Sequence, residues 1–205
     1  GDTPNFGQGF GDKHAGDNKT LTPSGGVDDG YDGTNYDVTF VAVSSGEITQ
    51  LEVTLSAVYD EKDYDGTDTS EETPNLTPSL AEGDTYDASQ RFESVHAGTP
   101  KMLAEITIYD GNSGGNYYVV YADDLYGLIN PRPITVTADT KSKIYGSEDP
   151  PLTYTASEEI IAGNEFTGEL TRETGEGIGV YEIQQGSLDL GIINGVGSNY
   201  AITYI

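Results

Sequence analysis

The chain has 205 residues and no cysteine, and its 35 Asp and Glu residues against nine Lys and Arg give a formal net charge of −26. The lack of cysteine excludes disulfides, thiolate metal sites and cysteine nucleophiles. The charge argues against nucleic acid as a partner, because phosphate binding needs clustered Lys and Arg. No apolar run reaches about 18 residues, so we expect no membrane insertion.

The start of the chain and its middle repeat one another. HAGDNKTL begins at His14 and HAGTPKML begins at His96, and these are the two histidines of the chain. The same offset of 82 residues matches Phe10 with Phe92 and Asp2 with Asp84. The histidines are therefore one repeat position that occurs twice, which weakens their interpretation as a metal-binding pair.

The dipeptide Asn-Tyr marks the end of each repeat. It occurs at Asn35-Tyr36, Asn116-Tyr117 and Asn199-Tyr200, each time after a Gly-rich turn, and opens the runs YDVTFVAV, YYVVYA and YAITYI. We expect Asn to close the turn and Tyr to enter a strand and pack. The runs LEVTLSA from Leu51 and PITVTA from Pro133 also align, and their alternation of apolar and polar residues predicts strands with one buried face.

Helical signal is scarce. The best candidate is Ser157–Asn164, where Ser157 could cap a helix and Gly163 could end it. The matching stretch LTPSLAEGD, residues 76–84, predicts one turn at most. The fold class expected from these patterns is mostly β, with tandem small β-sandwich-like modules and at most one short helix in each. Two-layer α+β modules are the alternative.

The repeats divide the chain into three segments. Residues 1–49 correspond to the C-terminal half of a repeat, residues 50–128 form a full repeat, and residues 129–205 form another. The chain opens within a repeat, so we expect it to be an internal piece of a longer protein. Asn130-Pro131-Arg132-Pro133 makes the second connection short and stiff. We expect separate folded modules, each with its own core.

The sequence of the C-terminal repeat resembles a known module. The phrases ITVTADTKSKIYGSEDPPLTYTA, GELTRETGEGIGVYEI and SNYAITYI, within residues 134–205, resemble the MBG domain of the YGX type, a mostly-β, glycine-rich module. The middle repeat resembles the YDG domain, through LEVTLSAVYDEKDYDGT, GDTYDASQRF, HAG and NYYVVYA. Residues 1–49 resemble the end of another YDG domain. Of the three YDG tripeptides, Tyr64-Asp65-Gly66 is the one in the family's position.

The resemblance implies a repeat module of a large bacterial surface or secreted protein of the adhesin type. Such modules are known mainly as architecture, so the resemblance supplies no catalytic residue. It implies an extracellular or cell-surface location. The acidic composition is compatible with a salty or calcium-bearing exterior, because screening is needed to offset self-repulsion in the compact state.

Calcium is the one candidate cofactor. It binds six to eight oxygen atoms from carboxylates and carbonyls in flexible loops. Two Asp clusters offer such ligands: Asp60, Asp63, Asp65 and Asp68 in one, and Asp28, Asp29 and Asp32 in the other. Neither has the spacing of an EF-hand. The competing interpretation is that Asp and Gly occur together because they tolerate turn geometry.

We expect no enzymatic activity. The chain has no nucleophile elbow of the G-x-S-x-G kind, and acidic residues are too abundant for a carboxylate pair to be informative. The predicted function is a stalk or spacer whose partners are the neighbouring repeats. One alternative is a filament of copies joined by strand exchange at the half-repeat. Another is direct binding of a surface glycan or protein through exposed Tyr side chains.

Overall fold

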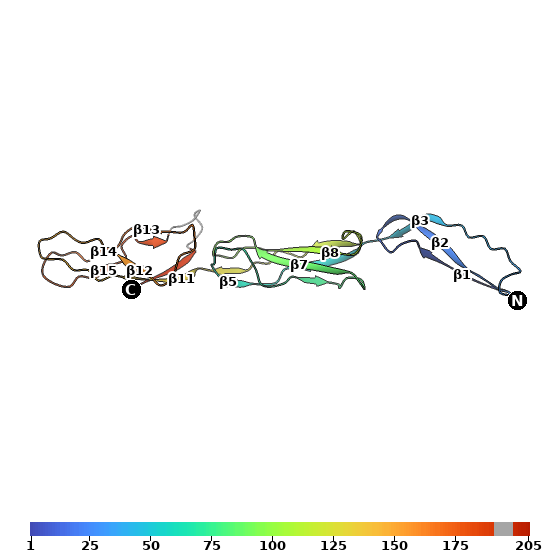
Figure 1. Cartoon of the computed structure of the whole chain (residues 1–205), viewed down its shortest axis with the longest axis horizontal. Coiled ribbons are helices and arrows are strands. Elements are labelled where there is room, and N and C mark those ends of the chain that lie inside the picture. Colours follow the sequence, from blue (N-terminus) through green and yellow to red (C-terminus); the bar gives the residue numbers. More distant parts are fainter. Residues whose placement is uncertain (191–198) are drawn as a thin grey trace. The chain divides into compact units, whose positions relative to one another are not determined.

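The computed structural model describes residues 1–190 and 199–205, and these residues form strands and turns without a helix (Figure 1). The mostly-β prediction is confirmed. In the described part of the chain, no helix exists that could cross a membrane. The strands are β1 Thr3–Phe10, β2 Gly16–Asp28, β3 Val43–Ile48, β4 Leu51–Ser56, β5 Glu61–Asp63, β6 Asn75–Thr77, β7 Thr85–Phe92, β8 Met102–Tyr109, β9 Tyr117–Tyr121, β10 Leu128–Asn130, β11 Arg132–Ala138, β12 Tyr154–Ala156, β13 Phe166–Thr167, β14 Thr171–Arg172, β15 Ile183–Gln184, β16 Asp189–Leu190 and β17 Tyr200–Tyr204.

The chain forms two compact units whose limits differ from those of the sequence repeats. Unit 1 comprises Gly1–Ser56, Pro74–Ser89 and Ala104–Asp123, and unit 2 comprises Ala57–Thr73, Gln90–Leu103 and Asp124–Ile205. The middle repeat, residues 50–128, therefore contributes to both units. Each unit contains the place where one repeat meets the next.

Both full repeats contain the same three-stranded sheet. Its order is β6-β4-β9 in unit 1 and β12-β11-β17 in unit 2. The central strand is the first strand of its repeat, and it pairs in parallel with the last strand. Leu51 lies opposite Tyr117 in one sheet, and Arg132 lies opposite Tyr200 in the other. The third strand of each sheet is antiparallel to the central one.

The central strands show the predicted alternation. Val53 and Leu55 of β4 are 0% and 1% exposed, whereas Leu51 at the start of the strand is 43% exposed. In β11, Ile134 and Val136 are buried. Successive side chains of a strand point to opposite faces, so each central strand covers a core with every second residue.

The core of unit 2 crosses the boundary between two repeats. Tyr64, Phe92 and Met102 of the middle repeat form one buried cluster with Ile134 and Leu190 of the C-terminal repeat. The prediction of separate cores was wrong here. A repeat of about 80 residues buries a limited share of its surface alone, and burial against the neighbouring repeat enlarges the apolar contact.

A smaller core lies in unit 1. It contains Val53, Ile108 and Tyr117, with Leu76 and Leu80 among the half-buried residues packed on it. All five come from the middle repeat.

The N-terminal half-repeat, residues 1–49, forms the sheet β1-β2-β3 and supplies no residue to either buried cluster. All residues of β1 are exposed, and the Phe6 ring stands edge-on to Phe40 with 6.2 Å between ring centres.

The helix candidate Ser157–Asn164 is a bend and a turn instead. The amide of Ile161, which would bond to Ser157 in a helix, donates to the Tyr200 hydroxyl at 2.9 Å. Asn164 closes a tight turn onto the carbonyl of Ile161 at 3.0 Å, with Gly163 at a φ of +90°. The tertiary contact with Tyr200 thus outweighs a weak local helical preference.

The strand prediction holds for two of the three Asn-Tyr runs. Residues 117–121 and 200–204 form β9 and β17, whereas residues 36–42 lie outside every strand of the described chain. The two runs that form strands pair with the first strand of the same repeat. Residues 1–49 include no counterpart of that first strand, which explains the difference.

Candidate functional site: the junctions between repeats

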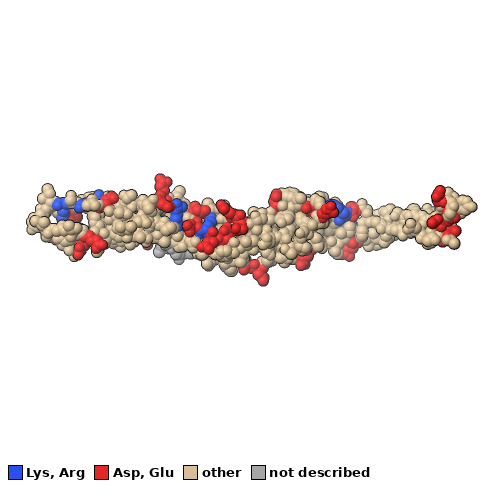
Figure 2. Space-filling view, turned by 90° about the horizontal axis from the view of Figure 1, so that it is seen from below, with Lys and Arg blue, Asp and Glu red and all other residues tan. Residues whose placement is uncertain are grey.

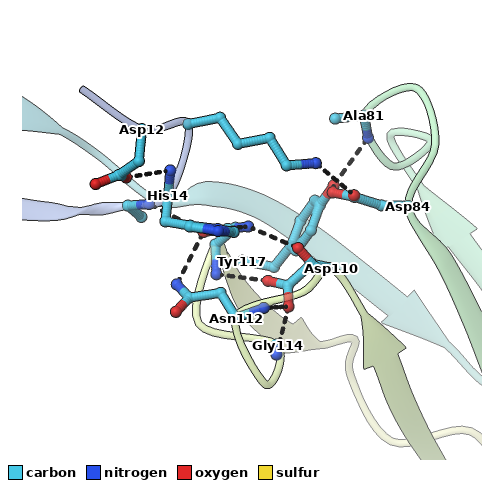
Figure 3. A network of polar contacts seen from close by, with 11 residues as sticks. Asp12, His14, Ala81, Asp84, Asp110, Asn112, Gly114 and Tyr117 are labelled. Carbon is cyan, nitrogen blue, oxygen red and sulfur yellow. Dashed lines mark hydrogen bonds and ion pairs between the residues drawn. The ribbon is translucent and has the colours of Figure 1, made fainter. Parts of the chain in front are cut away.

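The first junction is formed by the histidine segment 12–16 and the Asn-Tyr turn 110–117 of the next repeat (Figure 3). The side-chain oxygen of Asn116 accepts a hydrogen bond from the amide of Ala15 at 2.9 Å. The side-chain nitrogen of Asn116 lies 3.3 Å from Nδ1 of His14. The Asn116 carbonyl accepts from the amide of Leu51, the first residue of β4, at 2.9 Å. One asparagine therefore connects the histidine segment to the first strand of the following repeat.

The second junction, formed by residues 94–98 and Asn199-Tyr200, has the same contacts. The Asn199 oxygen accepts from the amide of Ala97 at 3.0 Å, and its nitrogen lies 3.2 Å from Nδ1 of His96. The Asn199 carbonyl accepts from the amide of Arg132, the first residue of β11, at 2.9 Å. The repeated histidines are thus explained by a repeated contact between successive repeats.

The hydrogen-bond pattern fixes the role of each imidazole nitrogen. Because the oxygen of Asn116 accepts from Ala15, the group that faces His14 is the amide NH₂, which can only donate. Nδ1 of His14 must therefore accept, and the neutral imidazole carries its proton on Nε2. The same assignment follows for His96 from the contact of Asn199 with Ala97. A doubly protonated imidazole would place a donor against a donor at both junctions.

The residue two positions before each histidine orients the histidine segment. The amide of His14 donates to the Asp12 carboxylate at 2.8 Å, and the amide of His96 donates to the Ser94 hydroxyl at 3.1 Å. Asp12 and Ser94 occupy the same repeat position. Side chains of this kind commonly bind an amide two residues further on, which turns the backbone locally.

An aspartate organises the turn that precedes each of the first two Asn-Tyr pairs. The Asp110 carboxylate accepts from the amides of Asn112 and Gly114 at 2.8 Å and of Asn116 at 2.9 Å. Asp29 accepts in the same way from the amides of residues 31, 33 and 35, at 2.8 to 3.0 Å. The backbones also match, since Asp32 and Ser113 share a φ near +55°.

These contacts change the acidity of both aspartates. Burial by itself raises the pKa of Asp110, but the three amide hydrogen bonds outweigh it and hold the pKa below its usual value. The pKa of Asp29 is lowered by the same balance. Amide donors favour the charged carboxylate, so both turns are held by ionised aspartate.

The tyrosine of each Asn-Tyr pair is buried, and its hydroxyl accepts a hydrogen bond from a backbone amide of another loop. The Tyr117 hydroxyl donates to Asp84 at 2.7 Å and accepts from the amide of Ala81 at 2.9 Å. In unit 2 the Tyr200 hydroxyl accepts from Ile161, and its ring stands edge-on to Tyr64 with 5.5 Å between centres. Tyr117 and Tyr200 are each 5% exposed.

Ion pairs lie around the junctions and elsewhere on the surface. Lys13 in the first histidine segment pairs with Asp84 at 3.3 Å, and the Asp84 side chain is only 6% exposed. On the face drawn in Figure 2, basic atoms lie beside acidic ones, and acidic side chains predominate. Further pairs are Lys19–Asp12, Lys62–Asp65, Arg91–Asp68, Lys101–Asp124, Arg132–Glu158, Lys143–Asp149 and Arg172–Asp149.

The first predicted calcium cluster is divided among protein partners. Asp65 accepts hydrogen bonds from the Lys62 ammonium group and from the amide of Thr67. Asp60 accepts from the Ser70 hydroxyl at 2.6 Å, and Asp68 pairs with Arg91. Asp63 ends β5, where it lies opposite Asn130 of β10. Across residues 1–190 and 199–205, no three His, Asp or Glu side chains converge in a way that could hold a metal ion.

The second predicted cluster lies in the Asp-Gly turn of the half-repeat. Asp29 binds the three amides described above, Asp28 accepts from the amide of Gly30 at 3.4 Å, and Asp32 has a positive φ of 56°. The turn geometry accounts for these residue types. Calcium binding by either cluster stays a prediction.

Comparison with known proteins concerns the C-terminal repeat. The family model of the MBG domain (YGX type) matches residues 134–205. The expected resemblance of this repeat is therefore confirmed, whereas the YDG resemblance of residues 1–49 and 50–128 stays a prediction. No curated protein and no solved structure matches the chain.

The sequence identified the residues of the junction but not which of them contact one another. The two histidines and the Asn-Tyr pairs were identified as repeat positions, but Asn was expected only to close its own turn. His14 and Asn116 are separated by 102 residues. One feature of the sequence could have indicated the pairing. The histidine segment occurs in residues 1–49 and 50–128, each of which is followed by another repeat, and it is missing from residues 129–205.

Proposed function

We propose that this chain is a non-catalytic repeat region that acts as a stalk or spacer in a bacterial extracellular protein of the adhesin type. The observation that carries the proposal is the pair of junctions. At each one, a single asparagine bonds the preceding repeat and the first strand of its own repeat. A spacer needs this property, because the orientation of one repeat is passed to the next only if neighbouring repeats are joined by more than the covalent linker.

The MBG match supports the proposal through the kind of module it identifies. The match lies in residues 134–205, and the resemblance of such modules to parts of bacterial surface proteins motivates an extracellular location. The buried tyrosines add support. Tyr117 and Tyr200 occupy the same repeat position, are buried, and accept hydrogen bonds from backbone amides. These contacts are typical of a structural role.

The experiment measures whether a junction is rigid. Because the chain lacks cysteine, Ser24→Cys and Ser89→Cys introduce two unique spin-label sites in unit 1, on either side of the first junction. Pulsed electron paramagnetic resonance should give one narrow distribution of the distance between the two spin labels, and Asn116→Ala should broaden that distribution. The same test in unit 2 uses Thr73→Cys and Ser147→Cys as the labelling sites and Asn199→Ala as the junction mutation. Broad distributions before any junction mutation would contradict a spacer role.

Calcium stiffening is a further part of the proposal. Its support is the net charge of −26, which divalent cations would screen or bind at specific sites. Thermal unfolding should be recorded with millimolar calcium, with magnesium and with chelator at equal ionic strength. A ligand at a hundred times its Kd stabilises the folded state by about 2.7 kcal/mol, which is a clear shift of the midpoint. Equal small shifts for both ions would mean general screening and would remove calcium from the proposal.

A further inference from the structure

Two turns of the chain share one geometry and end in different residues. The amides of Ala81 and Ile161 each donate to the hydroxyl of the buried tyrosine of their own repeat, both at 2.9 Å. Three residues further on, the amides of Asp84 and Asn164 donate back to the carbonyls of these two residues, at 3.1 and 3.0 Å. Asp84 of the middle repeat and Asn164 of the C-terminal repeat therefore occupy the same repeat position.

In both units, this position contacts the repeat that comes before. The ammonium group of Lys13, in the first histidine segment, pairs with the Asp84 carboxylate at 3.3 Å. In unit 2, the side-chain nitrogen of Asn164 donates to the hydroxyl of Tyr64, which belongs to the middle repeat, at 3.4 Å. The position is thus part of each junction, and it is acidic at the first junction and neutral at the second.

The residue before each histidine changes in the same direction. Lys13 precedes His14, whereas Val95 precedes His96, at the offset of 82 residues that relates the two histidine segments. The replacement of Lys by Val therefore accompanies the replacement of Asp by Asn. The first junction has an ion pair at two positions where the second junction has two uncharged residues.

The two members of the ion pair do not depend on each other equally. The Asp84 side chain is 6% exposed, whereas that of Lys13 is 66% exposed. One oxygen of Asp84 accepts from the Tyr117 hydroxyl at 2.7 Å, and the other pairs with Lys13. A carboxylate withdrawn from water is costly without its cation, whereas an exposed ammonium group without a partner stays hydrated. Loss of Lys13 should therefore cost more than loss of the charge on Asp84.

We propose that these two positions determine which repeats can follow one another. A repeat with Lys before its histidine fits a following repeat with Asp at the end of the 81–84 turn, and a repeat with Val fits one with Asn. The middle repeat followed by a copy of itself would place Val95 against Asp84 and leave the carboxylate without its cation. Specific interfaces use unpaired charges of this kind against wrong partners. The pairing rests on the proposed spacer function, because it would fix the order of repeats along the spacer.

The test is a double-mutant cycle in the full chain that places the uncharged pair of the second junction in the first. The measurement is the exchange rate of the Ala15 amide, because this amide is bonded to Asn116 across the junction and exchanges when the junction opens. Lys13→Val should speed this exchange about fivefold. Asp84→Asn and the double variant should both stay within about twofold of the unmodified chain.

Glu82→Gln is the matched control for the second substitution. Glu82 is an exposed carboxylate of the same turn, so its replacement changes the net charge as Asp84→Asn does. In the Lys13→Val background it should leave exchange about fivefold faster than in the unmodified chain, because exposed charges interact weakly at about 0.15 M salt.

Two results would overturn the pairing. One is an unchanged exchange rate in Lys13→Val. The other is an acceleration that persists in the double variant, or that Glu82→Gln reverses as well as Asp84→Asn does. Either result leaves the spacer function standing if the spin-label distances across the first junction are narrow. Broad distances in the unmodified chain would instead contradict the spacer function itself.

Discussion

At the residue scale, the junction depends on one amide side chain that serves as acceptor and donor at once. Replacing Asn116 by Ala leaves the amide of Ala15 and Nδ1 of His14 without their partner. A lost hydrogen bond with an unsatisfied group costs about 1–3 kcal/mol. We expect Asn116→Ala and Asn199→Ala to lower the free energy of unfolding by that amount, as measured by urea denaturation.

Asn35 supplies the matched control for this prediction. It occupies the same repeat position, but its side chain is exposed and bonds no histidine segment in the described chain. Asn35→Ala should change the stability by less than about 0.5 kcal/mol. Equal effects of all three substitutions would mean that Asn acts within its own turn and not through the junction.

The aspartate of the turn predicts a dependence on pH. The pKa of Asp110 is lowered in the folded chain, so folding favours the ionised carboxylate. Its contribution is complete above the unfolded value of about 3.9 and is lost as the pH falls toward the lowered folded value. Asp110→Asn removes the charge and replaces one of the two accepting carboxylate oxygens by an NH₂ donor, so it should lower the stability at pH 7 and flatten the loss of stability as the pH falls below about 4. Urea denaturation at several pH values measures this; an unchanged acid limb would contradict it.

At the scale of elements, Gly127, the residue before β10, shows how tightly the middle repeat is packed at this point. A Cβ added at Gly127 would lie 2.7 Å from Phe92 and Met102 and 2.8 Å from the Asp60 carbonyl. Phe92 and Met102 are buried and cannot move away. Gly127→Ala should therefore destabilise the chain by about 1–3 kcal/mol through overpacking.

Gly46 is the counterpart of Gly127 in the half-repeat. There the added Cβ would lie 2.7 Å from the ring of Phe10 and 3.0 Å from the Lys19 carbonyl. Since Phe10 is half-exposed, its ring can turn aside, and Gly46→Ala should cost clearly less than Gly127→Ala in thermal unfolding. A larger cost at Gly46 would show that the half-repeat is packed as tightly as the full one.

At the scale of the whole molecule, the position of the cores decides which segments unfold together. Ile134 of the C-terminal repeat lies in one cluster with Tyr64 and Phe92 of the middle repeat. Ile134→Ala should cost about 3 kcal/mol. It should speed amide exchange by about 100-fold in residues 57–73 and 90–103 as well as in its own repeat.

Val53 provides the reciprocal experiment. It belongs to the core of unit 1, so Val53→Ala should speed exchange in β4 and β9 and leave β11 and β17 unchanged. If Ile134→Ala affected only residues 129–205, the repeats would behave as independent modules in spite of the shared cluster.

Local pattern was sufficient for the strands of the full repeats. Alternation in Leu51–Ser56 and at Ile134 and Val136 indicates which face is buried, because the side-chain period of a strand is two and needs no tertiary information. Repetition also identified the equivalent positions of the histidines and the Asn-Tyr pairs. The Asp-Gly turns were recognised as a possible alternative to calcium sites, and the amide bonds of Asp29 give that alternative its geometry.

Only the tertiary structure decided which repeat positions meet and where a predicted element fails. The contact of His14 with Asn116 and the core shared by Phe92 and Ile134 join residues of different repeats, and similarity between repeats contains no information on how one packs against the next. The helix expected at 157–164 is replaced by a turn because a distant hydroxyl, that of Tyr200, takes its amide. The strand expected at 36–42 is not formed because a strand requires a partner, and residues 1–49 contain none for it.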